Sequence, residues 1–330
     1  TTMGAEAEWP NHPYARATGG WLDAPQQFFT DPESLRLQEA LFRHLVARLG
    51  DSPALFGWKL WSECDLTNHD RNDLIDWHRR MGQWFHDHDS YRHPVTTHWS
   101  GSWLTPDRQL AALPELDFLT IDAYHDPGRP LAEMISASTQ DAVRKNLDGL
   151  ALLKKPVWIS EFGGNWNGCS PEQLRAEMAS APWAALMTGH AAAPLSWWFE
   201  WVDQEQAFAS FTAIRAFIAD EDLRGVDAKP VGLSIASSGR TCWARGYARP
   251  GRMLGYVLDR QWGISGDDAP AIADARITVG NDVRAGSVHL EWWNADTGTI
   301  IARTTLDHPG GRLNLEAPPF TRHLAFKMTR

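Results

Sequence analysis

Short apolar runs alternate with longer segments of helical spacing through residues 30–220. Residues that favour turns separate these runs, as is typical of buried strands. Strands that alternate with helices form parallel βαβ units, because parallel neighbours need a long crossover connection. The alternation therefore predicts an α/β fold. The predicted strands lie at 55–62, 94–100, 116–124, 156–161 and 193–201.

The segments between these strands begin and end with helix signals. Thr30-Asp-Pro-Glu33 offers a capping residue, a proline in the first turn and an early acid, and Gly50 stops the helix that follows. Residues 1–30 are rich in Gly, Pro, Asn and Ala and are predicted to form a long loop. The predicted helices lie at 30–50, 72–87, 139–153, 171–190 and 205–220.

Five parallel strands in this order indicate a (β/α)8 TIM barrel in which strands 4 to 8 are present. A closed barrel of this kind has eight strands, and an open piece of five would leave two unpaired edges and an exposed inner face. We therefore expect the first three strand–helix units to come from an upstream segment or from another chain.

The helical period disappears after Pro230. Short alternating runs such as Met253-Leu-Gly-Tyr-Val-Leu and Ser287-Val-His-Leu-Glu-Trp-Trp follow, separated by Pro-Gly, Asp-Asp and Asp-Thr-Gly turns. This pattern predicts a small antiparallel β-sandwich. We expect residues 1–230 to be the C-terminal part of a barrel catalytic domain and residues 231–330 to be a β-sandwich accessory domain.

Charge and hydropathy exclude several classes of partner. The formal net charge is −10, which argues against nucleic acid because phosphate binding needs clustered Lys and Arg. No apolar stretch approaches the roughly 20 residues that cross a bilayer, so no membrane partner is expected. The three cysteines are too few for a disulfide framework. A bridge between Cys64 and Cys169 stays open beside the alternative of inert thiols.

Two glutamates each follow one of the apolar strands. Glu63 closes the run that begins at Leu55, and Glu161 closes the run that begins at Pro156. Strand ends that open onto the same face of a barrel bring distant residues together. A retaining glycosidase needs such a pair, because one carboxylic acid protonates the leaving oxygen while a carboxylate about 5–5.5 Å away attacks the anomeric carbon.

The segments Phe56-Gly-Trp-Lys-Leu-Trp-Ser-Glu63-Cys-Asp65 and Trp158-Ile-Ser-Glu161-Phe-Gly resemble the clan of retaining (β/α)8 glycoside hydrolases (clan A) that includes cellulases and β-mannanases. The resemblance implies an acid/base glutamate at the end of strand 4 and a nucleophile at the end of strand 7. With 55–62 as strand 4, the run 156–161 becomes strand 7. Glu63 is then the acid/base, kept protonated by partial burial and by the nearby Glu161 carboxylate, and Glu161 is the ionised nucleophile.

One position departs from the clan. The residue before the acid/base is usually Asn, whose side chain binds the 2-hydroxyl of the substrate, and here it is Ser62. A serine hydroxyl is shorter and has one donor where an amide has two. If that contact strengthens in the transition state, its weakening slows the chemistry as well as binding.

The resemblance also assigns supporting residues. Tyr124 matches the residue whose hydroxyl supports the nucleophile, and Trp198 matches the tryptophan that floors the subsite of the reacting sugar. Trp197 should then point the other way, because side chains alternate along a strand. Further candidates for substrate contacts, each with a structural alternative such as an ion pair, are Glu200, His98, Asp122, His125 and Asn165.

Eighteen tryptophans are present, and a flat apolar face suits a sugar ring as well as a protein core. Those in or beside predicted loops are the better candidates for exposure: Trp21, Trp99, Trp103, Trp166 and Trp198. The histidines between His78 and His93 lack the spacing of a metal motif, so neither a metal nor another cofactor is expected.

The sequence therefore predicts a hydrolase of β-linked glycans, glucan-like or mannan-like, that uses double displacement. A carbohydrate-binding pseudoenzyme is the alternative from another class, and a transglycosidase would use the same residues. A protein that degrades polysaccharide is expected to be secreted or periplasmic, although the sequence shows no signal peptide.

Overall fold

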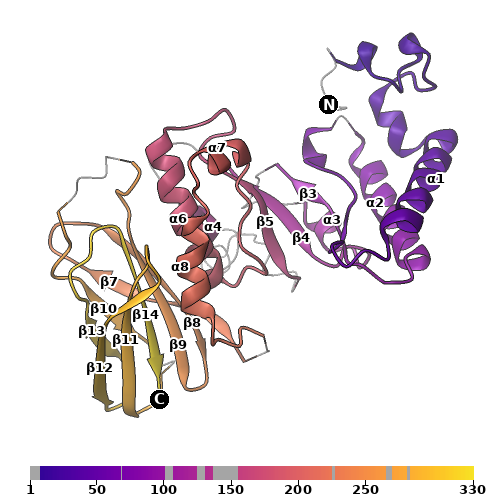
Figure 1. The fold of residues 1–330 in the computed structure, drawn as a ribbon. Coiled ribbons are helices and arrows are strands. Elements are labelled where there is room, and N and C mark those ends of the chain that lie inside the picture. Colours follow the sequence, from indigo (N-terminus) through magenta and orange to yellow (C-terminus); the bar gives the residue numbers. More distant parts are fainter. Residues whose placement is uncertain are drawn as a thin grey trace. The chain divides into compact units, whose positions relative to one another are not determined.

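The computed structural model describes residues 8–67, 69–100, 107–124, 131–136, 155–224, 227–264, 270–280 and 283–330. The chain forms two compact units (Figure 1). The first contains Thr1–Asp122 and Leu150–Trp158, and the second contains Ala123–Gly149 and Ile159–Arg330. Strands β4 (Leu119–Ala123) and β5 (Val157–Phe162) each have residues in both units.

The first unit begins with short 3-10 helices and continues with two long α-helices. Asp31 caps α1 by accepting a hydrogen bond from the N–H of Ser34, and Asp70 caps α2 through the N–H groups of Asn72 and Asp73. The cap predicted at the start of the first helix is confirmed, and Asp70 caps the helix predicted at 72–87. The helices of this unit are η1 (Trp9–Asn11), η2 (Arg16–Thr18), η3 (Pro25–Phe29), α1 (Pro32–Leu49), η4 (Cys64–Leu66), α2 (Arg71–His88) and α3 (Arg108–Ala111).

The strands of the first unit are shorter than predicted. The expected strand 55–62 is reduced to β1 (Trp58–Lys59), which pairs in parallel with β2 (Val95–Thr96), although the ladder continues with the N–H of Leu60 donating to the carbonyl of Thr96. A separate sheet has the order β3-β4-β5, in which β3 (His98–Trp99) runs parallel to β4. Parallel pairing along the chain agrees with the predicted α/β class.

The second unit contains the helices α4 (Leu131–Ser136), α6 (Pro171–Thr188), α7 (Phe199–Gln204) and α8 (Ala209–Ile218). Ser170 caps α6 through the N–H of Gln173, and Gly189 ends it in the left-handed conformation that glycine adopts without strain. Of these helices, α6 and α8 correspond to those predicted at 171–190 and 205–220, and α4 and α7 were not predicted. The helix predicted at 139–153 lies outside the described residues.

The prediction of a strand at 193–201 is wrong. Only a bridge forms there, between Ser196 and Phe162, and the chain turns into α7 at Phe199. The ladder ends after the N–H of Trp197 donates to the carbonyl of Phe162. Trp198 then leaves the extended conformation, with ψ 54°, and its indole bonds to the backbone of Gly163. An apolar run alone could not distinguish this short bridge and helix from a strand.

The C-terminal part of the second unit is antiparallel. One sheet has the order β12-β11-β14-β9-β8-β6, and the other has the order β13-β10-β7. The strands are β6 (Lys229–Gly232), β7 (Ser234–Ala236), β8 (Cys242–Arg249), β9 (Arg252–Asp259), β10 (Arg276–Val279), β11 (Gly286–Asn294), β12 (Thr299–His308), β13 (Leu313–Glu316) and β14 (His323–Thr329).

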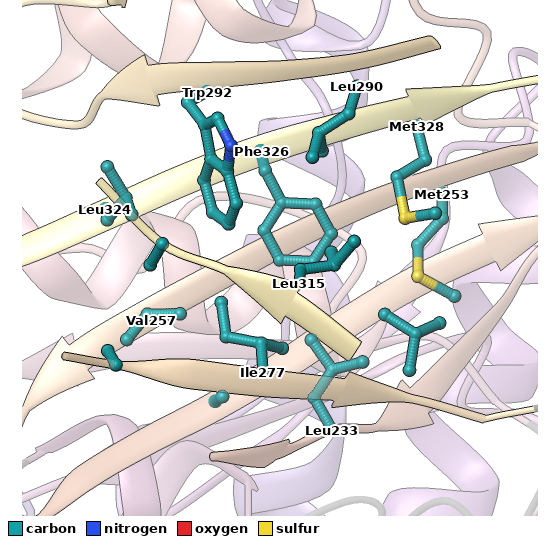
Figure 2. Close-up of a cluster of buried hydrophobic side chains, with 14 of the residues drawn as sticks. Leu233, Met253, Val257, Ile277, Leu290, Trp292, Leu315, Leu324, Phe326 and Met328 are labelled. Atoms are coloured by element: carbon teal, nitrogen blue, oxygen red, sulfur yellow. The ribbon is translucent and has the colours of Figure 1, made fainter. Parts of the chain in front are cut away.

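A single hydrophobic cluster takes side chains from both antiparallel sheets (Figure 2). Ile277 and Leu315 come from the three-stranded sheet, and Val257, Trp292 and Phe326 come from the six-stranded sheet. Buried and less buried residues alternate through much of β11, as expected for a strand with one face on a core. Burial of these apolar side chains is the main source of stability for this part of the chain.

Helices α6 and α8 lie against the six-stranded sheet (Figure 1). Trp183 of α6 stacks on Tyr256 of β9 with ring centroids 5.5 Å apart. The buried ammonium of Lys327 lies 2.8 Å from a carboxylate oxygen of Glu221 and 4.8 Å from the ring centroid of Phe217. The second unit therefore runs across residue 230, and the domain boundary expected there remains a prediction.

None of the helices in the described ranges is long and apolar enough to span a membrane.

Candidate functional site

Glu63 lies in the first unit, where the segment after β1 turns sharply into η4. Its backbone is left-handed, with φ 51° and ψ 55°, and its carbonyl accepts a hydrogen bond from the N–H of Leu66. A non-glycine residue in this conformation costs roughly 1–2 kcal/mol, and such strain is concentrated at functional sites. Its side chain is half-buried. Position and backbone both mark Glu63 as a candidate functional residue.

The turn that carries Glu63 is tied to the end of β3. The carboxylate of Asp65 accepts from the N–H of Ser100 at 2.8 Å and from its hydroxyl at 2.6 Å. Two hydrogen bonds to one carboxylate restrict the segment, because charge-assisted bonds are stronger than neutral ones. Asp65 was not among the predicted site residues, and its position two residues after Glu63 was the only sequence signal.

Ser62, His98 and Asp122 form a hydrogen-bonded chain within the first unit. Ser62 Oγ lies 3.0 Å from His98 Nδ1, and His98 Nε2 bonds to Asp122 Oδ1. The His98 and Asp122 side chains are fully buried, whereas Ser62 is exposed. Burial, followed by the positive charge of Lys59, lowers the pKa of His98 to about 3. The imidazole is therefore neutral near neutral pH.

Glu161 lies in the second unit near the end of β5. The hydroxyl of Tyr124 donates a hydrogen bond to its Oε2 at 3.1 Å. A hydrogen bond to a carboxylate favours its ionised form and restricts its rotation. The structure thus brings together Tyr124 and Glu161, as the resemblance implied. Both side chains are half-buried, so part of each is accessible.

The peptide segment after Glu161 is held from two sides. The indole Nε1 of Trp198 donates to the carbonyl of Gly163 at 2.7 Å, and the N–H of Gly164 donates to Oε2 of Glu177 at 2.7 Å. The glycines have φ 141° and 65°, and a Cβ on Gly163 would lie 2.4 Å from the Trp198 ring. A side chain is therefore excluded at Gly163 and Gly164, and the backbone beside Glu161 is fixed.

Glu177 is a second supporting residue, after Asp65, that was not predicted from the sequence. It is 4% exposed and also accepts from Nε2 of Gln173 at 2.8 Å. A buried carboxylate needs such partners, because an unpaired one is costly. The available signal was an acid among the apolar positions of a helix, between Ala176 and Met178.

Several aromatic side chains near these residues are exposed. Trp166, which follows the glycine turn, is 74% exposed, as predicted. Trp197 and Phe199 are 46% and 61% exposed, with ring centroids 6.4 Å apart, and Trp198 is half-buried. Exposed aromatic faces of this kind suit the C–H faces of sugar rings.

The other predicted contact residues differ in exposure. Glu200 is exposed in the first turn of α7, and Asn165 is half-buried in a tight turn with Gly168. The expected exposure of Trp99 is wrong: it is 2% exposed, because β3 lies in the interior of its unit. Trp21 is half-buried. The candidates that lie outside the described residues are Trp103 and His125.

All three cysteines are free. Burial raises the pKa of Cys64 to about 12, and burial followed by the charge of Glu177 raises that of Cys169 to about 12. Burial and the charge of Asp259 raise the pKa of Cys242 to about 11. Thiolates are the reactive form of cysteine, so the thiols are inert at neutral pH, as one of the two sequence-based alternatives expected.

No protein-family model matches the sequence, and no curated protein matches it either. Solved structures do match. One described as a glycoside hydrolase has a TM-score of 0.59 at 10% identity, over 89% of this chain and 69% of its own. A glycoside hydrolase family 5 structure from Bacteroides vulgatus ATCC 8482 has a TM-score of 0.56 at 11% identity, over 89% and 66%.

The chain therefore resembles glycoside hydrolases in fold, which confirms the resemblance inferred from the two glutamate motifs. It spans about two thirds of the length of each of these proteins. Identity this low supports a shared fold, and function has to be argued from the site itself.

Proposed function

We propose that this protein is a retaining glycoside hydrolase that cleaves β-linked glycans by double displacement. The observation that carries the proposal is the contact between Tyr124 and Glu161. A carboxylate near the end of β5 is held by a phenolic hydroxyl at 3.1 Å, in a chain with the fold of glycoside hydrolases. A fixed carboxylate is what a nucleophile requires, since reaction rates depend on a preorganised attack geometry.

In the first step, Glu161 attacks the anomeric carbon while Glu63 donates a proton to the leaving oxygen. A covalent glycosyl–enzyme ester results, and the leaving sugar departs with the proton. In the second step, Glu63 removes a proton from water, which attacks the same carbon and releases Glu161 as a carboxylate. No external oxidant, reductant or cofactor enters either step.

The other residues have supporting roles in this proposal. Tyr124 orients Glu161 and stabilises the carboxylate when it departs, and Trp198 supplies an apolar face for the reacting sugar. Trp166, Glu200 and Asn165 are proposed to contact neighbouring sugar units. The acidic composition and the exposed aromatic rings favour a neutral glucan or mannan as the substrate.

The scaffold follows from the same proposal. Residues 1–230 would contribute strands 4 to 8 of a (β/α)8 barrel, and residues 231–330 would form a β-sandwich beside it. The bridge at Ser196 would stand for strand 8. Strands 1 to 3 would be supplied by a further polypeptide segment, and the protein would act on polysaccharide outside the cytoplasm.

Hydrolysis of activated aryl β-glycosides tests the proposal. The complete polypeptide that carries this sequence is assayed on glucosides, mannosides and cellobiosides. We expect turnover that the Glu161→Gln variant abolishes and that the Glu172→Gln variant keeps, because Glu172 is exposed on α6. Oligosaccharide binding without any Glu161-dependent turnover would instead identify a carbohydrate-binding pseudoenzyme, the alternative favoured by Ser62. Transfer of the sugar to an added acceptor in preference to water would identify a transglycosidase.

A further inference from the structure

Ser62 is the exposed end of the hydrogen-bonded chain that it forms with His98 and Asp122, whose side chains are buried. It directly precedes Glu63, so in the proposed function its hydroxyl lies next to the group that protonates the glycosidic oxygen. We infer that Ser62 is a specificity-determining residue that accepts a hydrogen bond from the substrate and does not donate one. The inference rests on the proposed function, because only that function identifies the ligand as a sugar.

The donor and acceptor in each of these hydrogen bonds follow from the buried carboxylate of Asp122. A carboxylate only accepts hydrogen bonds, so the nitrogen that bonds to Asp122 has to carry a proton. That nitrogen is His98 Nε2. A neutral imidazole carries one proton, which leaves Nδ1 with a lone pair and no hydrogen.

The tautomer of His98 also determines the direction of the Ser62 hydroxyl proton. Nδ1 of His98 is 3.0 Å from Ser62 Oγ and can only accept, so the hydroxyl proton of Ser62 is directed to it. Ser62 has no other proton to give. The two lone pairs of its oxygen remain for a ligand. Burial lowers the pKa of His98 to about 3, which favours the neutral ring and this arrangement of protons.

The substrate group that meets Ser62 is therefore a donor. A sugar hydroxyl or a protonated amino group satisfies it, whereas an ether oxygen or a fluorine, which only accept, leave the serine oxygen unpaired. An asparagine at this position would present amide donors instead. Leaving a polar group of a site unpaired is how enzymes reject near-isosteric ligands, so the chain selects among substituted sugars.

The tautomer of His98 is measured first, by nitrogen NMR of the protein with labelled histidine. The His98→Gln variant assigns the signal. We expect a protonated Nε2 and an unprotonated Nδ1. A protonated Nδ1, which either a neutral Asp122 or a charged imidazole would produce, overturns the inference because Ser62 would then be free to donate. This measurement requires no catalytic activity.

Substrate analogues then test the role in recognition. Aryl β-glycosides with each hydroxyl replaced in turn by hydrogen or by fluorine are compared on wild type and Ser62→Ala. The position that contacts Ser62 is the one where removal of the hydroxyl costs about fivefold to tenfold in kcat/KM on wild type and less on Ser62→Ala. At that position we expect wild type to lose the contact with fluorine as with hydrogen.

The Ser62→Asn variant tests the opposite case, in which the residue before Glu63 can donate a hydrogen bond. An amide can donate to fluorine, so the ratio of fluorine to hydrogen analogue should rise in Ser62→Asn relative to wild type, and the inductive effect of fluorine cancels in that comparison. A wild-type enzyme that prefers fluorine over hydrogen at this position, or no position coupled to Ser62, overturns the inference. No turnover of the parent glycosides overturns the proposed function and the recognition role with it, while the tautomer result stands alone.

Discussion

The hydroxyl of Tyr124 donates a hydrogen bond to Oε2 of Glu161 across 3.1 Å. A hydrogen bond to a charged acceptor contributes about 1.5–3 kcal/mol, and each 1.36 kcal/mol corresponds to tenfold in rate. Tyr124→Phe keeps the ring and removes the donor. We expect kcat to fall by about 10-fold to 100-fold on aryl β-glycosides, with an unchanged unfolding midpoint.

Tyr91→Phe is the control for this change, because Tyr91 is 64% exposed and belongs to the first unit. Its kinetics should match wild type. Equal kcat values in Tyr124→Phe and Tyr91→Phe would show that the hydroxyl does not assist Glu161.

Glu177 supports the glycine turn by accepting a hydrogen bond from the N–H of Gly164. In Glu177→Gln, an amide group has to face the N–H of Gly164 or the amide of Gln173, so one buried donor loses its acceptor. The expected cost is about 1–3 kcal/mol of unfolding free energy. Chemical denaturation measures it, with Glu172→Gln of the same helix as the control. A cost below about 0.5 kcal/mol would mean that the turn does not depend on Glu177.

His78 makes the stability of the first unit depend on pH. Its Nδ1 bonds to the carbonyl of Leu74 and its Nε2 to the hydroxyl of Thr97, and burial lowers its pKa from 6.5 to about 4. A lowered folded pKa means that the unfolded chain binds more protons between these two values. Stability from His78 is therefore present above pH 6.5 and is lost as pH falls toward 4.

Between these pH values His78 contributes at most about 1.4 kcal/mol per pH unit to the slope of unfolding free energy against pH. His78→Gln should reduce the slope of unfolding free energy against pH by up to that amount, whereas His44→Gln, at an exposed position, should leave it unchanged. Parallel curves for wild type and His78→Gln would contradict the assignment of a neutral buried ring.

Gly255 of β9 pairs with Phe326 of β14, and a Cβ added to Gly255 would lie 2.1 Å from the Phe326 ring. Gly255→Ala should therefore destabilise the protein by about 1–3 kcal/mol or more through overpacking. Phe326→Leu should relieve most of this cost, so the two changes should be strongly non-additive in a double-mutant cycle. Additive costs would show that the backbone adjusts instead.

The sequence predicted the features that depend on local chemistry. The cap at Asp31, the strand that carries Glu161 and the change to antiparallel strands after Pro230 all have local signals. The segment 193–201 was wrongly predicted to be a strand, because an apolar run does not reveal where a ladder stops. Networks such as Ser62 with His98 depend on the register between strands far apart in sequence, which a single sequence does not specify.

The central claim is that Glu161 is the nucleophile and Glu63 the acid/base of a retaining hydrolase. Replacement of a nucleophile by alanine leaves space on the face that it attacked, so added azide should react there and give an α-glycosyl azide from a β-glycoside. Replacement of the acid/base leaves the glycosyl–enzyme step intact on activated substrates, so azide should give the β-glycosyl azide.

The most direct measurement is therefore the anomeric configuration of the azide products, by proton NMR, from Glu161→Ala and Glu63→Ala with an aryl β-glycoside. We expect the α-product from Glu161→Ala and the β-product from Glu63→Ala. The opposite assignment, or wild-type rates without azide in Glu161→Ala, would contradict these roles.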